Sequence, residues 1–285
     1  MDHSKLVQSF LRLTRGTKWT LNETIPLKFN NRHAQGLTRI GGLFYLSSVE
    51  VTRPPVKYDR PIQGADRSPG QGIGRLFAFD RRGELVNETV LGEGTIYHPG
   101  GIDFDGSRIW VPAAEYVPGG RSIVYKVDPA TLRAEEAFRF GDHIGGLVCD
   151  RDGGRLIGCS WGSRTFYVWD NDGKLLAAKE NPSHFVDYQD GQYAGEGCMT
   201  WSGISELPLP APAGGLKHYE LGGLALFDTA SLSMLHEVPV AGFSPHGRAA
   251  TRNPVFLESD GSRLRLYAVP DDDCGSLLIY EAAAD

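Results

Sequence analysis

Three histidines open similar glycine-containing segments at wide intervals along this 285-residue chain. The segments are His33-Ala34-Gln35-Gly36, His98-Pro99-Gly100-Gly101 and His143-Ile144-Gly145-Gly146. Imidazole exchanges protons near neutral pH and is the commonest metal-binding side chain in proteins. A set of histidines at one repeated position therefore points to a candidate site for a divalent metal ion.

Two weaker copies of this segment begin with other side chains. They are Tyr188-Gln189-Asp190-Gly191-Gln192 and Arg252-Asn253-Pro254-Val255-Phe256. Five copies of a unit of about fifty residues are typical of propellers and solenoids. In a propeller the first residue of every copy would face a shared centre, which predicts a ring of His33, His98, His143, Tyr188 and Arg252.

The elements that must position this ring are strands. After Gly16 the chain consists of short apolar or alternating runs separated by Gly, Asp and Asn turns, a pattern typical of antiparallel sheet. The runs form five groups, which span residues 35–92, 100–140, 144–180, 188–240 and 254–281. The last group lacks a fourth strand, while the run 18–26 before the first group has no partner. We therefore predict an all-β, five-bladed propeller of four-stranded antiparallel blades, whose last blade is completed by the N-terminal strand.

The whole chain, 1–285, is predicted to be a single propeller domain with three additions. Residues 1–17 form an arm with a short helix over 5–14, because Leu6, Phe10 and Leu13 follow helical spacing. Two long, proline-rich insertions, 51–73 and 204–220, leave the second strands of blades one and four. Loops of this length are usually functional, and we expect both to act as lids over the ring.

Composition narrows the partners and the compartment. The net charge of −6, without a basic cluster interleaved with aromatic residues, argues against nucleic acid. No apolar run is long enough to span a membrane and no signal peptide is visible, so we expect a cytoplasmic protein, with a longer exported precursor left open. The four cysteines lack metal or disulfide spacing and should be reduced. We expect a small-molecule partner and a monomer or weak dimer.

The geometry of a blade gathers further side chains at the mouth that holds the ring. In antiparallel strands, the start of the inner strand and the end of the second strand lie at the same edge. We assign catalysis to His98, His143, Arg252 and Tyr188. Substrate binding is assigned to His33, Gln35, Glu50, Glu115, Tyr116, Trp161, Trp201, Gln189 and Asn253. Ser160, Asp187 and Asp272 fall at this mouth without an assigned role.

Structural roles are open alternatives for several of these residues. The histidines could hydrogen-bond between neighbouring blades around the axis. Glu50 and Glu115 could pair with Arg252 and Lys57, or lie in solvent. The indoles of Trp161 and Trp201 could pack blades together, as large aromatic side chains commonly do.

Longer segments resemble, over nearly the whole chain, a family of uncharacterised β-propeller proteins. The matching segments are SSVEVT (47–52), YHPGGIDFDG (97–106), DHIGG (142–146), SWGSR (160–164), NPSHF (181–185) and TRNP (251–254). The resemblance implies the fold but no established activity. Members often carry an export signal, which this chain does not show. A looser similarity is to the cofactor-free hetero-Diels–Alderases of tropolonic sesquiterpenoid pathways, and no catalytic residue is carried over from them.

Three functions fit these features. The first is a cofactor-independent cyclase of hetero-Diels–Alder type that acts on a quinone-methide-like intermediate, with aromatic walls and the donors His98, His143 and Arg252. The second is a metal-dependent hydrolase, lactonase or lyase, in which His33, His98 and His143 hold a divalent ion, with Glu50 or Glu115 as fourth ligand or base. The third is a ligand-binding propeller without chemistry. We favour the first and expect no cofactor.

Overall fold

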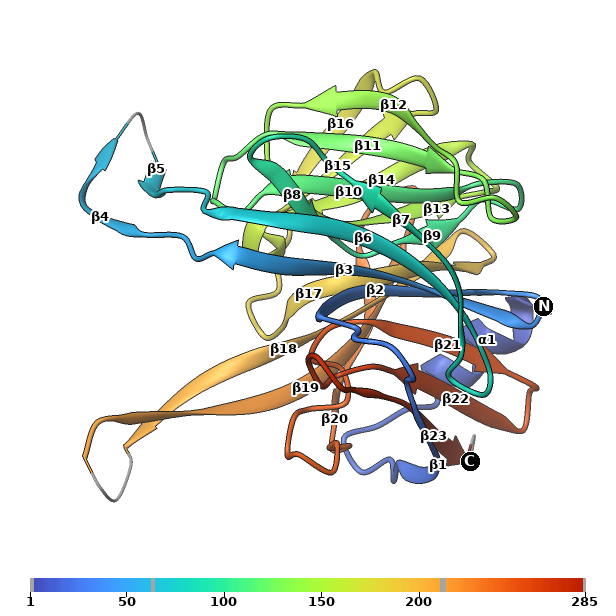
Figure 1. The fold of residues 1–285 in the computed structure, drawn as a ribbon. Helices are drawn as coiled ribbons and strands as arrows, with labels where there is room; N and C mark the ends of the chain where they lie inside the picture. Colours follow the sequence, from blue (N-terminus) through green and yellow to red (C-terminus); the bar gives the residue numbers. More distant parts are fainter. Residues whose placement is uncertain (1–2, 63–64, 211–213, 284–285) are drawn as a thin grey trace.

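A computed structural model describes residues 3–62, 65–210 and 214–283 of the chain. Its strands form five antiparallel blades of a β-propeller, which Figure 1 shows from the side. Blade one contains β2 (His33–Ile40), β3 (Leu43–Arg53), β6 (Gln71–Asp80) and β7 (Leu85–Leu91). Blade two contains β8 (Ile96–Pro99), β9 (Asp103–Phe104), β10 (Ile109–Glu115), β11 (Ser122–Val127) and β12 (Ala134–Phe140). The predicted fold class is confirmed.

The other three blades follow in chain order. Blade three contains β13 (Ile144–Asp150), β14 (Arg155–Ser160), β15 (Thr165–Asp170) and β16 (Leu175–Glu180). Blade four contains β17 (Asp187–Gly195), β18 (Cys198–Pro210), β19 (Leu216–Asp228) and β20 (Met234–Val240). Blade five contains β21 (Val255–Ser259), β22 (Arg263–Ala268), β23 (Ser276–Ala283) and β1 (Thr20–Pro26). A short 3-10 turn, η1 (Trp161–Ser163), follows β14.

The N-terminal strand closes the ring as predicted. β1 pairs antiparallel with β23, from Thr20 opposite Glu281 to Pro26 opposite Ser276. Helix α1 (His3–Leu11) precedes it and buries Leu6 and Phe10 in the same apolar cluster as the cores of blades four and five. Pairing satisfies the backbone groups that β23 would otherwise expose at a sheet edge. In the described part of the chain, no helix has the length and apolar character to cross a membrane.

One predicted strand differs from the structure. The inner strand of blade two, expected over 100–105, is divided into β8 and β9. The amides between them bond in three directions: Gly100 donates to Pro112 O, Gly101 to Gly145 O of blade three, and Ile102 to Asp190 Oδ1 of blade four. Two of these bonds leave the blade, so the ladder of blade two is interrupted where the blades meet.

The axis is too crowded for side chains at some inner-strand positions. A Cβ on Gly36 would lie 2.6 Å from the Ile102 nitrogen, and one on Gly101 would lie 2.5 Å from the Gln189 oxygen. Glycine therefore lets inner strands of different blades approach each other. Gly36 and Gly101, which follow two of the histidines, thus have a structural role.

Two buried carboxylates connect the blades across this crowded axis. Asp190 accepts hydrogen bonds from the amides of Leu37 (2.8 Å), Val255 (3.0 Å) and Ile102 (3.0 Å), which belong to blades one, five and two. It also accepts one from Gly191. Asp103 Oδ2 accepts from Cys149 and Tyr193, which links blade two to blades three and four. The two carboxylates together bridge all five blades.

The two long insertions are β-ribbons. In the second, β18 and β19 stay paired from Cys198 opposite Asp228 to Pro210 opposite Leu216, so the predicted loop 204–220 is largely sheet. In the first, β4 (Lys57–Ile62) pairs with β5 (Ala65–Arg67) beyond the ends of β3 and β6. Both ribbons extend to the left in Figure 1, on the same side of the propeller. Residues 63–64 and 211–213 of the predicted lids lie outside the described residues.

The axial role of Asp190 makes a prediction about stability. Replacing it by alanine (Asp190→Ala) should lower the free energy of unfolding by about 3 kcal/mol or more, because each buried donor left unpaired costs about 1–3 kcal/mol. Chemical denaturation at pH 7 measures this. Asp172→Ala, in an exposed turn, is the control and should change stability by less than about 0.5 kcal/mol. Equal stability of the two variants would contradict the bridging role.

Candidate functional site

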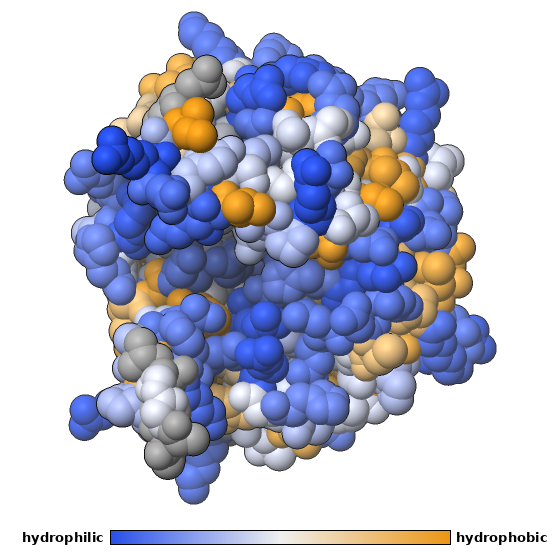
Figure 2. Space-filling view, turned by 60° about the vertical axis from the view of Figure 1, so that its left-hand side comes forward, coloured by the Kyte–Doolittle hydropathy of each residue, from blue (hydrophilic) through white to orange (hydrophobic). Residues whose placement is uncertain are grey.

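A cavity of about 400 Å³ opens at the mouth from which the two ribbons extend. Figure 2 shows a hydrophilic hollow on this face. All five blades contribute to its lining, which includes His33, Gln35, His98, Tyr116, His143, Trp161, Asp187, Gln189, Arg252 and Asn253. Pockets of this size bind small organic molecules. Nine of these ten residues were assigned a role at the site, and the tenth, Asp187, was placed at this mouth without a role.

Stacked aromatic rings form one wall of the cavity. The rings of His98 and Tyr116 are parallel within 16°, with centroids 4.3 Å apart. Trp161 lies 5.4 Å from Tyr116 and 4.8 Å from His143, again between ring centroids. The first ribbon reaches this wall through Arg67, whose guanidinium lies 5.6 Å from the Trp161 ring centre. Such a wall offers flat apolar surface to a planar ligand.

The imidazoles of His98 and His143 are neutral. The Nδ1 of His143 lies 2.7 Å from the Glu115 carbonyl oxygen, so Nδ1 carries the proton and Nε2 is an acceptor. Burial lowers the pKa of His143, outweighing the Glu115 bond and the charge of Asp142. Burial, followed by the neighbouring His143 and His33, lowers the pKa of His98 well below its ordinary value. Two neutral imidazoles thus face the cavity from blades two and three.

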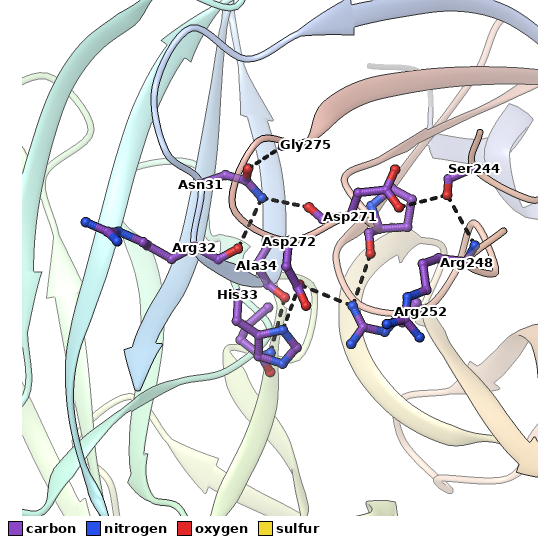
Figure 3. Close-up of polar contacts among 12 residues, drawn as sticks. Asn31, Arg32, His33, Ala34, Ser244, Arg248, Arg252, Asp271, Asp272 and Gly275 are labelled. Carbon is purple, nitrogen blue, oxygen red and sulfur yellow. Dashed lines mark hydrogen bonds and ion pairs between the residues drawn. The ribbon is translucent and has the colours of Figure 1, made fainter. Parts of the chain in front are cut away.

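A network of charged groups holds the opposite side of the cavity, as Figure 3 shows. Asp272 Oδ1 accepts from His33 Nδ1 at 2.9 Å and from Arg252 Nη1 at 3.1 Å, which ties blade one to blade five. Arg252 Nη1 also donates to the Pro270 carbonyl, and its Nε lies 3.4 Å from Glu220 Oε1. Burial opposes ionisation of Asp272, but His33 and Arg252 hold its pKa below the ordinary value. These contacts fix the guanidinium of Arg252 at the cavity.

Asp187 is the carboxyl group in the lining with the most altered acidity. Burial raises its pKa to about 6, against the charge of Arg164 and a hydrogen bond from Gln189. Its Oδ1 is buried and has no hydrogen-bond partner among the described residues. The same is true of two other lining atoms, His98 Nε2 and Asn253 Nδ2. Buried polar atoms are nearly always bonded, so unpaired ones in a cavity mark where a ligand or water bonds.

Three predicted site residues lie outside the cavity lining, and a fourth, Tyr188, lines it with a hydroxyl that is bonded elsewhere. The Tyr188 hydroxyl donates to Glu237 and its ring packs against Phe227, so the predicted catalytic phenol is held in the blade core. Trp201 is fully buried and is not part of the lining, so a role in packing the blades fits this residue better than substrate binding. Two acidic residues also lie outside the lining: Glu50 pairs with Arg32 and Arg75, and Glu115 pairs with Arg121. The ion pairs of Glu50 and Glu115 are therefore not the ones with Arg252 and Lys57 that were given as an alternative.

The sequence reasoning missed contributions from the second ribbon and from Asp187. Ile204 and Glu206, at the base of the β18–β19 ribbon, line the cavity. Both residues fall inside the insertion 204–220 that was predicted as a lid, and this position was the feature of the sequence that could have indicated their place at the cavity. In this structure the ribbons contribute wall residues. Asp187 directly precedes Tyr188, but its burial, which determines its acidity, is not visible in the sequence.

The three-histidine metal alternative has the following geometry. Ring centroids are 6.4 Å apart for His33 and His98, and 6.2 Å apart for His98 and His143. Within residues 3–62, 65–210 and 214–283, no group of three His, Cys, Asp or Glu side chains is spaced to hold a metal ion. The cysteines of the described chain are free thiols, as expected, with only Cys274 exposed.

The acidity of the two neutral imidazoles is directly testable. We expect the ring resonances of His98 and His143 to titrate below pH 6.5 in NMR spectra, with His98→Gln and His143→Gln providing the assignments. Because the pKa of each imidazole is lower in the folded protein, the unfolded chain binds more protons than the folded protein when the pH falls below 6.5. These groups therefore lower the free energy of unfolding as the pH falls below 6.5. Titration of either ring at or above pH 6.5 would contradict the described environment.

Comparison with known proteins identifies a family but no activity. Residues 3–285 match the family described as "Family of unknown function (DUF6454)". This agrees with the predicted membership of an uncharacterised propeller family. None of the curated proteins matches the chain.

Several solved structures resemble the fold. The mannose phosphorylase MPT-4 from Leishmania mexicana, determined with a phosphate ion, is 13% identical with a TM-score of 0.50, over 91% of this chain and 88% of that one. The tail fibre of Staphylococcus aureus phage P68 is 10% identical with a TM-score of 0.50, over 100% of this chain and 56% of that one. A DUF4221 family member from Bacteroides vulgatus is 10% identical with a TM-score of 0.44, over 95% and 99%. At such identities the likeness concerns the fold alone.

Proposed function

The chain belongs to this family of unknown function, and from the site itself we propose that it is a small-molecule enzyme. Its axial cavity polarises a carbonyl group of a planar substrate and moves a proton beside that carbonyl. The observation that carries the proposal is Asp187, a buried carboxyl with an unpaired oxygen and a pKa of about 6. A general base works best when its pKa lies near the working pH.

The residues of the cavity divide the work of such a reaction. Arg252 and Asn253 are adjacent hydrogen-bond donors, and both line the cavity. Aimed at a carbonyl oxygen, they would stabilise the negative charge that develops there in the transition state. Ionised Asp187 would take the proton from the carbon next to the carbonyl, and the carboxyl, after exchanging this proton with water, would deliver a proton to another carbon of the conjugated system. Substrate and product then differ in the position of one hydrogen and of one double bond.

The aromatic wall would hold the reacting group in place. A conjugated substrate gains contact with Trp161 and Tyr116 when it lies flat against them. Holding the carbon that loses its proton near the base replaces a random encounter by a fixed geometry. The neutral state of His98 and His143 keeps further positive charge out of this wall.

The hetero-Diels–Alder cyclisation favoured in the sequence analysis is the narrower alternative. It uses the same wall and the same polarisation of a carbonyl, but it needs no proton transfer. None of the comparisons named above concerns such an enzyme, so this reaction stays a prediction. Asp187 separates the two reactions, because only proton transfer depends on it.

Deuterium exchange tests the proposal without a known substrate. The protein is incubated in D₂O with a metabolite extract of the producing organism, and molecules that gain one deuterium are found by mass spectrometry. Asp187→Asn should slow this gain by about 10²–10⁴-fold, the usual contribution of a general base. Arg252→Gln should also slow it, through loss of oxyanion stabilisation.

The pH dependence and a matched variant sharpen the test. Asp187 acts as a base only when ionised, so kcat/KM should rise through about pH 6 and level off above it. Asp172→Asn makes the same chemical change in an exposed turn and should leave the exchange unaltered. Consumption of a metabolite that needs Arg252 but not Asp187 would overturn proton transfer in favour of cyclisation. Binding without any turnover would overturn the enzyme in favour of a ligand-binding propeller.

A further inference from the structure

The unpaired polar atoms of the cavity divide by chemical type and by position. Among the described residues, five buried side-chain nitrogen or oxygen atoms lack a partner, and three of them belong to the cavity lining. His98 Nε2 lies on blade two, beside the acceptor Nε2 of His143, and Asn253 Nδ2 is a donor on blade five. The third is Oδ1 of Asp187, already assigned to proton transfer. We infer that the substrate is a planar molecule with a carbonyl or carboxylate oxygen at one end and a hydroxyl group at the other.

This inference rests on the proposed function, because it assigns the substrate class of the same cavity. It adds a role for His98 and His143, which polarisation of the carbonyl does not use. These two imidazoles select substrates that carry the hydroxyl.

The acceptor end is fixed by the tautomer of His143. His143 Nδ1 donates to the Glu115 carbonyl oxygen at 2.7 Å, which leaves Nε2 without a proton. The unpaired atom of the neighbouring His98 ring is its Nε2. His143 Nε2 is therefore an acceptor to which a bound ligand must supply a hydrogen, and a ligand group that both donates and accepts can bond His98 Nε2 in either tautomer. A hydroxyl group does this, whereas an ether, a methyl group or a bare ring edge does not.

The donor end is fixed by the contacts of Arg252. Its bonds to Pro270 and Asp272 use Nη1, and its contact with Glu220 uses Nε. A guanidinium has five N–H groups, so donors remain for a ligand. Asn253 Nδ2 adds a neutral donor from the next residue, and only 6% of the Asn253 surface is exposed. Such a pair suits an oxygen that carries full or partial negative charge.

The wall between these ends sets the shape of the ligand. Tyr116 stacks on His98 and approaches Trp161, so the aromatic surface is continuous with the acceptor end. A flat ring in contact with this wall would direct one substituent to the imidazoles and the opposite one to blade five. A phenol with a carbonyl group on its side chain has this arrangement of groups, and a saturated carbon next to that carbonyl would supply the proton that Asp187 removes.

Three commercial compounds test the inference by isothermal titration with the full chain. 4-Hydroxycinnamate carries both groups, cinnamate lacks the hydroxyl, and methyl 4-hydroxycinnamate lacks the charged oxygen. We expect 4-hydroxycinnamate to bind at least about tenfold more tightly than either of the others, because loss of the hydroxyl leaves a buried acceptor unpaired and loss of the charge weakens the bonds from Arg252. Equal affinities for 4-hydroxycinnamate and cinnamate would overturn the role of the imidazoles.

Variants connect each preference to its residue. His143→Phe keeps an aromatic ring but removes the acceptor, so the tenfold preference for the hydroxyl should fall below about threefold. Arg252→Gln should weaken binding of both acids more than binding of the ester, whose carbonyl oxygen carries no full charge. The control is Arg265→Gln. Arg265 on β22 pairs with Glu281 on β23 and is not part of the cavity lining, so this variant should bind all three compounds as the native protein does. Thermal melts confirm folding, and an unchanged hydroxyl preference in folded His143→Phe contradicts the inference.

The outcomes distinguish this inference from the proposed function. If deuterium exchange depends on Asp187 but no hydroxyl preference exists, the substrate class is wrong and the enzyme stands. If the preference exists but no metabolite exchanges deuterium or is consumed, the ligand class stands and the enzyme is wrong.

Discussion

Closure of five blades around one crowded axis is the constraint on which this structure depends. Asp190 contributes much to this closure, because its buried carboxyl group accepts hydrogen bonds from the backbone amides of Leu37, Ile102 and Val255 on three other blades. At the mouth, Asp272 makes a similar connection between His33 and Arg252. Burial raises the pKa of Asp190, and the amide donors oppose that effect. The inner strands that these groups hold together are the ones that present the cavity residues.

The chemistry of the cavity follows from which blade supplies each wall. Blade five supplies donors, blades two and three supply neutral imidazoles, and blade four supplies a carboxyl group of raised pKa. The imidazoles are neutral because a rigid, buried setting disfavours their charged form. A cavity built in this way has a polarity from one side to the other, and it orients a ligand before any reaction begins. Orientation and charge stabilisation together account for much of enzymatic rate enhancement.

The periodicity of the sequence was enough to predict the backbone of this site. The unpaired run 18–26 and the incomplete last blade predicted the β1–β23 pairing, and the repeated segment predicted that His33, His98, His143 and Arg252 converge. It could not predict the directions of individual side chains. The pairing of β17 with β18 shifts register between Tyr188 and Asp190, and the Tyr188 hydroxyl bonds to Glu237 inside the blade. The sequence shows neither of these features. Ion-pair partners and the burial of Asp187 depend likewise on contacts between distant segments, which a local pattern does not contain.

A crystal structure of the protein with 4-hydroxycinnamate would test the central claim most directly, that the mouth of the propeller is its functional site. The account predicts the ligand flat against Trp161, with its carboxylate within hydrogen-bond distance of Arg252 and Asn253 and its hydroxyl at the imidazoles of His98 and His143. A ligand bound at the opposite end of the axis, or in this cavity with the hydroxyl toward Arg252, would contradict it.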